Sequence, residues 1–173
     1  GGPVTTAAAG VPEKGATDPQ ERAQRRWQGH FDKWGARYLD DGFSSPGAGA
    51  VSERELEAVA RAVEAVRGDG GVTAVDLGCG PARVLAALAS QGCTAVGMDQ
   101  APAMCRVAAG GGHAVVLGRV GDPLPFKDGS VDLVTAIRVL KYVPEWDGVL
   151  DEVARILRPG GRFVVELSLS TGV

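Results

Sequence analysis

Three acidic residues stand where the chain leaves successive short apolar segments. Asp76 belongs to the first of these segments, Asp99 follows the second and Asp122 follows the third. If the segments are parallel strands, their carboxyl ends meet at one edge of a sheet, where small ligands bind. Carboxylates can accept hydrogen bonds there from an ammonium group, from ribose hydroxyls or from the exocyclic amine of adenine. The acids therefore predict a site for a ligand with a cationic group.

A glycine loop follows the first apolar segment and reads Gly78-Cys79-Gly80-Pro81-Ala82-Arg83. The dinucleotide fingerprint needs glycine where Arg83 stands, and a P-loop would need a Gly-Lys-Ser/Thr sequence that is missing here. Asp76, two residues before the loop, would also repel a pyrophosphate. The loop and the acids together predict a phosphate-free adenosine derivative that carries a positive charge. S-adenosylmethionine, with its sulfonium and ammonium groups, meets that description.

The elements that must position these residues alternate along the chain. Apolar runs predict five β-strands, at 72–77, 94–98, 114–117, 130–136 and 162–167. Helical spacing of apolar residues predicts three intervening helices, at 82–91, 101–109 and 145–157. The last of these helices is followed by the turn Arg158-Pro159-Gly160-Gly161. Because strands alternate with helices across short loops, we predict an α/β fold, a Rossmann-like doubly wound parallel sheet.

An aromatic helix is predicted before the sheet, over residues 20–41. Four rings fall on one of its faces, at spacings of four, three and four: Trp27, Phe31, Trp34 and Tyr38. This face either packs on the core or covers a ligand as a lid, since aromatic rings can cover an adenine or a cation. The two interpretations are compatible.

The chain is predicted to have three parts. Residues 1–19 lack periodicity and are expected to form a disordered leader, whereas residues 20–67 form N-terminal helices that act as a lid or cap. The second of these helices is expected to start at Ser52, with Glu55 completing a capping box. Residues 68–173 form the ligand-binding Rossmann-like domain.

Composition narrows the class of protein. A net charge of −3 without a basic stripe argues against nucleic-acid binding, and no apolar run approaches the ~18 residues that span a bilayer. Cys79, Cys93 and Cys105 form no close pair, which is typical of a reducing compartment, so we predict a cytoplasmic protein. With two histidines, His30 and His113, we predict no metal site.

Four motifs, in order and with matching spacing, resemble class I S-adenosylmethionine-dependent methyltransferases, in particular the subgroup with the LPF-x-D-x-S-[FV]-D motif. They run from the glycine loop to the turn before the fifth strand: Val75-Asp76-Leu77-Gly78-Cys79-Gly80, Gly97-Met98-Asp99, Leu124-Pro125-Phe126-Lys127-Asp128-Gly129-Ser130-Val131-Asp132 and Leu150 to Gly161. The segment from Phe31 to Tyr38 is similar to the N-terminal segment that often precedes them. The resemblance covers the chain from Phe31 to Leu167.

The resemblance implies roles for particular residues. Gly78, Cys79 and Gly80 would approach the methionine part of the cofactor, with Asp76 orienting their loop. Asp99 would hold the ribose. The remaining predicted cofactor contacts are Tyr38, Met98, Gln100, Asp122, which would face the adenine, and Ile137, which with Arg138 would line the methyl-transfer side. We name no catalytic base.

The sequence departs from the family in three places. Ala82 occupies the position of a frequent third glycine, and the segment after Asp122 is shorter than the family form. The chain also ends at Val173, just past the fifth strand, where the family continues with a helix and an antiparallel strand pair. We therefore predict a sheet truncated after the fifth strand, whose open edge a second copy could cover in a homodimer.

The predicted activity is in-line methyl transfer to a small-molecule acceptor. The fourth strand ends Val134-Thr135-Ala136-Ile137-Arg138, without the Asn/Asp-Pro-Pro-aromatic sequence associated with methylation of amide or base nitrogens. Two alternatives stay open. One is a protein of this fold that binds the cofactor without catalysis, and the other is an NAD-dependent oxidoreductase, against which Arg83 and Asp76 count.

Overall fold

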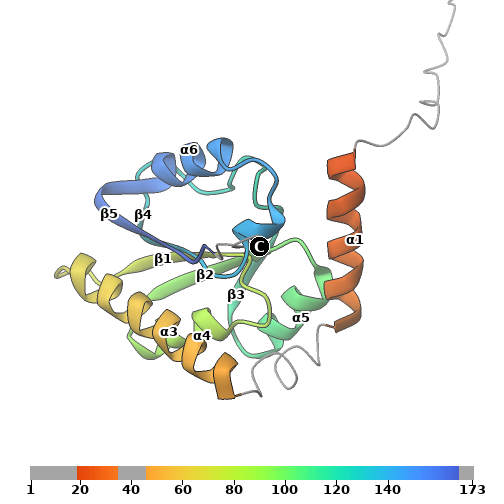
Figure 1. The fold of residues 1–173 in the computed structure, drawn as a ribbon. Helices are drawn as coiled ribbons and strands as arrows, with labels where there is room; N and C mark the ends of the chain where they lie inside the picture. Colours follow the sequence, from red (N-terminus) through yellow and green to blue (C-terminus); the bar gives the residue numbers. More distant parts are fainter. Residues whose placement is uncertain (1–18, 35–45, 168–173) are drawn as a thin grey trace, which may run out of the picture.

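The computed structural model describes residues 19–34 and 46–167, which build one sheet and its covering helices (Figure 1). Five parallel strands lie in the order β3-β2-β1-β4-β5. Their bounds are Thr73–Leu77 (β1), Thr94–Asp99 (β2), Ala114–Leu117 (β3), Val131–Ala136 (β4) and Leu157–Val165 (β5). The first strand is central, so the loop that follows it lies in the middle of the carboxyl edge of the sheet.

Helices cover both faces of this sheet, with α6 on one face and α3 and α4 on the other (Figure 1). Their bounds are Pro19–Trp34 (α1), Pro46–Val66 (α3), Arg83–Ser90 (α4), Pro102–Gly110 (α5) and Asp147–Ile156 (α6), with a short 3-10 helix, η1, at Leu140–Tyr142. The predicted α/β fold with a doubly wound parallel sheet is confirmed. No helix within the described ranges is both long enough and apolar enough to cross a membrane.

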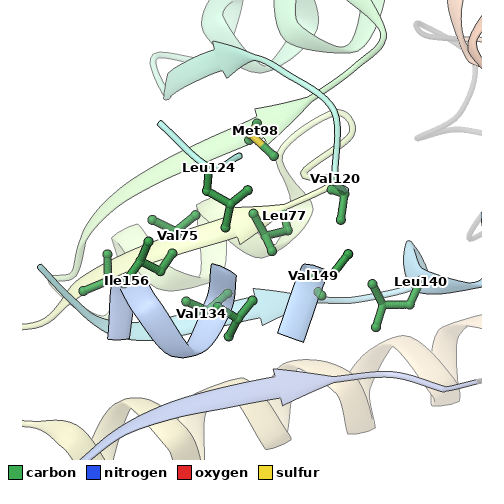
Figure 2. Packing of buried hydrophobic residues seen from close by; sticks show 12 residues of the cluster. Val75, Leu77, Met98, Val120, Leu124, Val134, Leu140, Val149 and Ile156 are labelled. Carbon is green, nitrogen blue, oxygen red and sulfur yellow. The ribbon is translucent and has the colours of Figure 1, made fainter. Parts of the chain in front are cut away.

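The side chains of β1 alternate between two buried cores. Val75 and Leu77 point into the core beneath α6, where Ile156 is also fully buried (Figure 2). Ala74 belongs to the opposite core, against Val59 of α3. Because successive side chains of a strand point to opposite faces, a strand covered on both sides reads as a continuous apolar run. This is why β1 was recognisable in the sequence.

The start of α3 differs from the sequence-based prediction. The helix begins at Pro46, six residues before Ser52, because proline is well suited to the first turn of a helix. Ser52 and Glu55 therefore lie inside the helix, and the predicted capping box is wrong. Both side chains contact Arg83 instead, with the Arg83 Nη2 atom 2.6 Å from a Glu55 carboxylate oxygen.

The fifth strand also begins earlier than predicted. Its register with β4 passes from Leu157, opposite Val131, directly to Arg162, opposite Leu133. The predicted turn at residues 158–161 is accommodated as an irregularity within β5, and Gly160 has a φ of 82° there. The strand is thus continuous with the end of α6.

Arg155 of α6 anchors the loop that leads into β4. Its guanidinium donates to the carbonyl oxygens of Leu124 and Phe126 and to the carboxylate of Asp128, at 3.0, 2.8 and 2.6 Å. Glu152 accepts from the Leu124 amide at 2.7 Å, and its hydrogen bond with Arg155 lowers the pKa of Glu152 to about 2. These contacts hold the loop from Leu124 to Asp128 on α6.

The core beneath α6 yields a test of the fold. Ile156→Ala removes a fully buried side chain, and we expect the free energy of unfolding to fall by about 2 to 5 kcal/mol. Leu150→Ala, on the same helix at a side chain that is 45% exposed, should change it by less than about 1 kcal/mol. Urea denaturation measures both values. Equal effects of the two substitutions would contradict the described packing of α6.

Candidate functional site

The glycine loop between β1 and α4 is tied to the end of β2 by three successive amides. The amides of Gly78 and Cys79 both donate to the carbonyl oxygen of Met98, at 2.7 and 3.0 Å. The amide of Gly80 donates to the Asp99 carboxylate at 2.9 Å. Because β1 and β2 are neighbours in register, with Leu77 opposite Met98, these bonds continue the contact between the two strands. The loop is therefore held by the protein itself.

Gly78 is required for two local reasons. Its φ of 68° favours glycine, and a Cβ atom added there would lie 2.4 Å from a side-chain methyl of Val139. Ala82, where the sequence departs from the family pattern, adopts a φ of 78° at the start of α4. Glycine takes that conformation more readily than alanine, which accounts for a frequent glycine at this position.

Asp99 binds two parts of the chain with one carboxylate. One oxygen accepts from Gly80, and the other accepts from the Ala101 amide at 2.9 Å, just before α5. A carboxylate can accept several hydrogen bonds, including those of ribose hydroxyls or an ammonium group. The side chain lies on the wall of a cavity at the carboxyl edge of the sheet.

Asp76 is a buried acid on the same cavity. Only 2% of the residue is exposed, and its carboxylate accepts a 2.6 Å hydrogen bond from the Thr135 hydroxyl of β4. Burial raises the pKa of Asp76 to about 7, against the opposing effects of Thr135 and of the positive charge of Arg83. Near neutral pH this residue can therefore gain or lose a proton when a charged ligand enters.

The cavity brings together most of the residues that the sequence nominated for cofactor binding. Seven of them line it: Asp76, Gly78, Cys79, Gly80, Asp99, Gln100 and Ile137. They come from the ends of β1, β2 and β4, as expected for adjacent parallel strands. Burial raises the pKa of the Cys79 thiol far above its ordinary range, so this cysteine is present as a neutral thiol.

Three other nominated residues have different positions. Met98 is 1% exposed, and its side chain packs in the core beneath α6, so its link to the site is its carbonyl oxygen. Asp122 is not among the described residues that line the cavity, and its carboxylate pairs with Arg119 at 3.0 Å. Tyr38 lies outside the described residues. The adenine contact expected of Asp122 stays a prediction.

An aromatic cluster that includes Tyr142 closes one side of the cavity. Tyr142, from η1, lies 4.7 Å from Trp27 and 5.4 Å from Phe31, measured between ring centroids. Phe31 and Tyr142 both line the cavity. Of the rings predicted on the N-terminal helix, Phe31 lines the cavity and Trp27 contacts Tyr142, and the lid stays a prediction. Tyr142 was missed because nothing local in the sequence distinguishes it from a surface tyrosine.

Two arginines also line the cavity, Arg83 at the start of α4 and Arg138 just after β4. Both pair with the buried carboxylate of Glu55, each at 2.6 Å. Arg138 has a φ of 60°, an uncommon conformation for a residue other than glycine. Arg83 entered the sequence argument only as a mismatch to a glycine fingerprint, and its partner could not be foreseen.

The chain matches the methyltransferase domain family over residues 75–165. This match spans more than half of the chain and runs from β1 to the end of β5, so the chain belongs to this family. The resemblance drawn from the four sequence motifs is confirmed.

Similar proteins carry related names. A sterol 4-C-methyltransferase of Caenorhabditis elegans is 33% identical over 104 residues, which cover 54% of this chain and 30% of that protein. A Haloferax volcanii protein in complex with the Trm112 methyltransferase activator is 32% identical with a TM-score of 0.62, covering 78% of this chain and 58% of that one. The Haemonchus contortus phosphoethanolamine N-methyltransferase 1, in complex with phosphoethanolamine and S-adenosylhomocysteine, shares the fold, with a TM-score of 0.69 at 16% identity over 88% of this chain and 34% of that one. The curated relatives are matched over only 30 to 51% of their own length.

The buried position of Asp76 predicts a pH-dependent stability. Its pKa is higher in the folded chain than in the unfolded chain, so the folded state holds the proton more tightly between pH 4 and 7. The free energy of unfolding should therefore fall as pH rises through this window, by up to about 4 kcal/mol. Asp76→Asn removes the titrating group, so the variant should gain stability relative to the parent chain as pH rises.

Urea denaturation at pH 4.5, 6 and 8 measures this difference. Asp151→Asn, which changes an exposed carboxyl of α6, is the matched control and should follow the parent chain. A difference between Asp76→Asn and the parent that is the same at all three pH values would contradict the assignment.

Proposed function

We propose that this chain forms the donor-binding part of an S-adenosylmethionine-dependent methyltransferase that acts on a small-molecule acceptor by in-line transfer. The proposal rests on the direction in which the amides of the glycine loop point. The amides of Gly78, Cys79 and Gly80 are all directed at the end of β2. A loop that binds a pyrophosphate presents such amides to the ligand, and this loop does not.

The residues present fit a cationic adenosine derivative. Two carboxylates, Asp76 and Asp99, line the cavity, and Asp76 lies two residues before the glycine loop that would meet the phosphates of a dinucleotide. Carboxylates repel phosphate but accept hydrogen bonds from ammonium and hydroxyl groups. The same chemistry argues against the NAD-dependent oxidoreductase considered from the sequence.

Roles can be assigned to the chain's own residues under this proposal. Asp99 accepts from the ribose hydroxyls, with Gln100 beside the adenosine. The backbone at Gly78 and Gly80 approaches the methionine part, with Asp76 beneath it. Ile137 borders the methyl-transfer side.

When bound, S-adenosylmethionine supplies an electrophilic methyl group on a sulfonium. The leaving thioether needs no proton, so the chain can act mainly by aligning the two reactants and excluding water. The apolar wall formed by Val139, Phe31 and Tyr142 serves this second purpose. Among the described side chains we assign none as a general base, which is needed only for an acceptor that must lose a proton.

The small-molecule acceptor is supported by two observations. The segment after β4, Ile137-Arg138-Val139, lacks the Asn/Asp-Pro-Pro-aromatic sequence associated with nitrogen methylation of bases and amides. The names of two similar proteins contain a small acceptor molecule, a sterol in one and phosphoethanolamine in the other.

The thiols of Cys79, Cys93 and Cys105 form no disulfide, which supports the expected cytoplasmic location.

Calorimetry with two ligands tests the proposal. S-adenosylhomocysteine should bind, because it keeps the ribose hydroxyls and the ammonium group. NAD should not bind, because its pyrophosphate would meet Asp76 and a glycine loop whose amides are already engaged by the end of β2. Binding of NAD alone, or of neither ligand by a folded chain, would refute the proposed donor. Binding without methyl transfer to any acceptor would favour the alternative of a cofactor-binding protein without catalysis.

Asp99→Ala should weaken S-adenosylhomocysteine binding about 10- to 100-fold, because the ribose loses a charged acceptor and Gly80 loses its anchor. Asp151→Ala, at an exposed acid of α6, is the control and should bind as the parent does. Isothermal titration at one salt concentration measures both affinities. Unchanged affinity in Asp99→Ala would remove the role given to this residue.

A further inference from the structure

Glu55 is a buried carboxylate that contacts two arginines from different parts of the fold. Only 6% of its side chain is exposed. One oxygen lies 2.6 Å from Nη2 of Arg83, and the other lies 2.6 Å from Nε of Arg138. Ser52, one helical turn earlier on α3, accepts a further hydrogen bond from Arg83 at 2.8 Å. One face of α3 therefore holds both guanidinium groups.

The two arginines belong to two different segments that line the cavity. Arg83 is the first residue of α4, directly after the glycine loop. Arg138 lies in the turn after β4, and the next residue, Val139, has a side chain so close to Gly78 that a Cβ atom there would collide with it. A displacement of either arginine would therefore move a wall of the cavity. Glu55 is bonded to both walls.

Stability alone is a weak reason for such an arrangement. Burying a carboxylate and its guanidinium partners removes these charged groups from water, which costs free energy. A protein with apolar side chains of similar volume in their place is often equally stable. The arginine side chains are only 17% and 20% exposed. A guanidinium with a fixed fork of donors is, however, well suited to holding a backbone segment in one position. Arg138 donates to Glu55 through Nε, and its backbone has an uncommon left-handed conformation with a φ of 60°.

We propose that Glu55 is a positioning residue of the donor site. By holding Arg83 and Arg138 it sets the separation between the glycine loop and the turn after β4, and with it the width of the cavity. Glu55 touches no ligand in this role and acts through the two arginines. The inference rests on the proposed function for its link to the donor, but the separation itself is a property of the chain without ligand.

Glu55→Gln is the central test. Glutamine keeps the shape of the side chain but offers one oxygen acceptor, so only one arginine can keep its bond. We expect S-adenosylhomocysteine affinity to fall about tenfold or more, since small misplacements in a site are costly to binding and alignment. Glu57→Gln, the same substitution two residues later at an exposed ion pair with Arg61, should keep the parent affinity. Affinities are compared well below the melting temperature of every variant, so that a loss of stability alone leaves them unchanged.

Amide resonances supply a readout that needs no ligand. In nitrogen–proton spectra of the free chain, Glu55→Gln should shift the amides of Gly80 and Val139, which flank the cavity, and leave that of Leu150 on α6 in place. If the parent chain does not bind S-adenosylhomocysteine, the proposed function fails, and this spectrum still decides whether Glu55 positions the two walls. Unshifted amides, or parent-like affinity in Glu55→Gln, would overturn the inference.

A second variant covers the case in which Glu55→Gln does not fold. Ser52→Ala removes one of the contacts that α3 makes with Arg83 and is compatible with a helix interior. It should weaken S-adenosylhomocysteine binding about threefold, less than Glu55→Gln, because Glu55 still holds both arginines. Parent-like affinity and an unshifted Gly80 amide in Ser52→Ala would overturn the inference as well.

Discussion

The site depends on the hydrogen bonds that join the glycine loop to the end of β2. The carbonyl oxygen of Met98 receives two amides of the loop, and the Asp99 carboxylate receives the third. These bonds are possible because β1 and β2 are parallel neighbours in register, so the loop leaves one strand beside the end of the other. The position of the loop then determines where α4 begins. Without this contact, the acids and the glycines would not face a common cavity.

The charges around the cavity are arranged in two groups. Asp76 and Asp99 lie at the ends of the central strands, whereas Arg83 and Arg138 are held on the side of α3 by Glu55. Burial disfavours the ionised form of Asp76 and raises its pKa. A buried acid that destabilises the fold in this way is typical of functional sites. A protein keeps a destabilising feature of this kind when its function, rather than the stability of the empty fold, depends on it. The arrangement is consistent with a ligand that carries its own positive charge.

The aromatic side of the cavity has a different origin. Phe31 comes from α1, before the sheet begins, and Tyr142 comes from η1, after β4. Their rings meet over the cavity although more than a hundred residues separate them in the chain. This side, the acid side and the arginine side are contributed by separate segments, and the sheet is the common frame that brings them together (Figure 1).

Much of the fold and the glycine-loop side of the cavity could be predicted from the sequence alone. Continuous apolar runs identified the strands, because a strand covered on both faces carries apolar side chains on both. The glycine loop with Asp76 and Asp99 identified the edge of the sheet where the cavity lies. Predictions from local sequence patterns were wrong where a side chain contacts a residue far away in the chain. Ser52 and Glu55 satisfy the pattern of a capping box, but Pro46 starts the helix earlier and Arg138, 83 residues away, takes one oxygen of Glu55.

Only the tertiary structure showed which residues form the aromatic side of the cavity, where Phe31 meets Tyr142. Asp122 follows its strand as Asp99 does, yet its carboxylate pairs with Arg119. Tyr142 lines the cavity without any local mark in the sequence, whereas Arg138, which the family resemblance placed there, lines it as expected but with a partner, Glu55, that was not foreseen. The physical reason is the range of the interactions. Strand and loop positions follow from the periodicity of neighbouring residues, whereas ion pairs and ring contacts depend on which surfaces the folded sheet and helices bring within a few ångströms of one another.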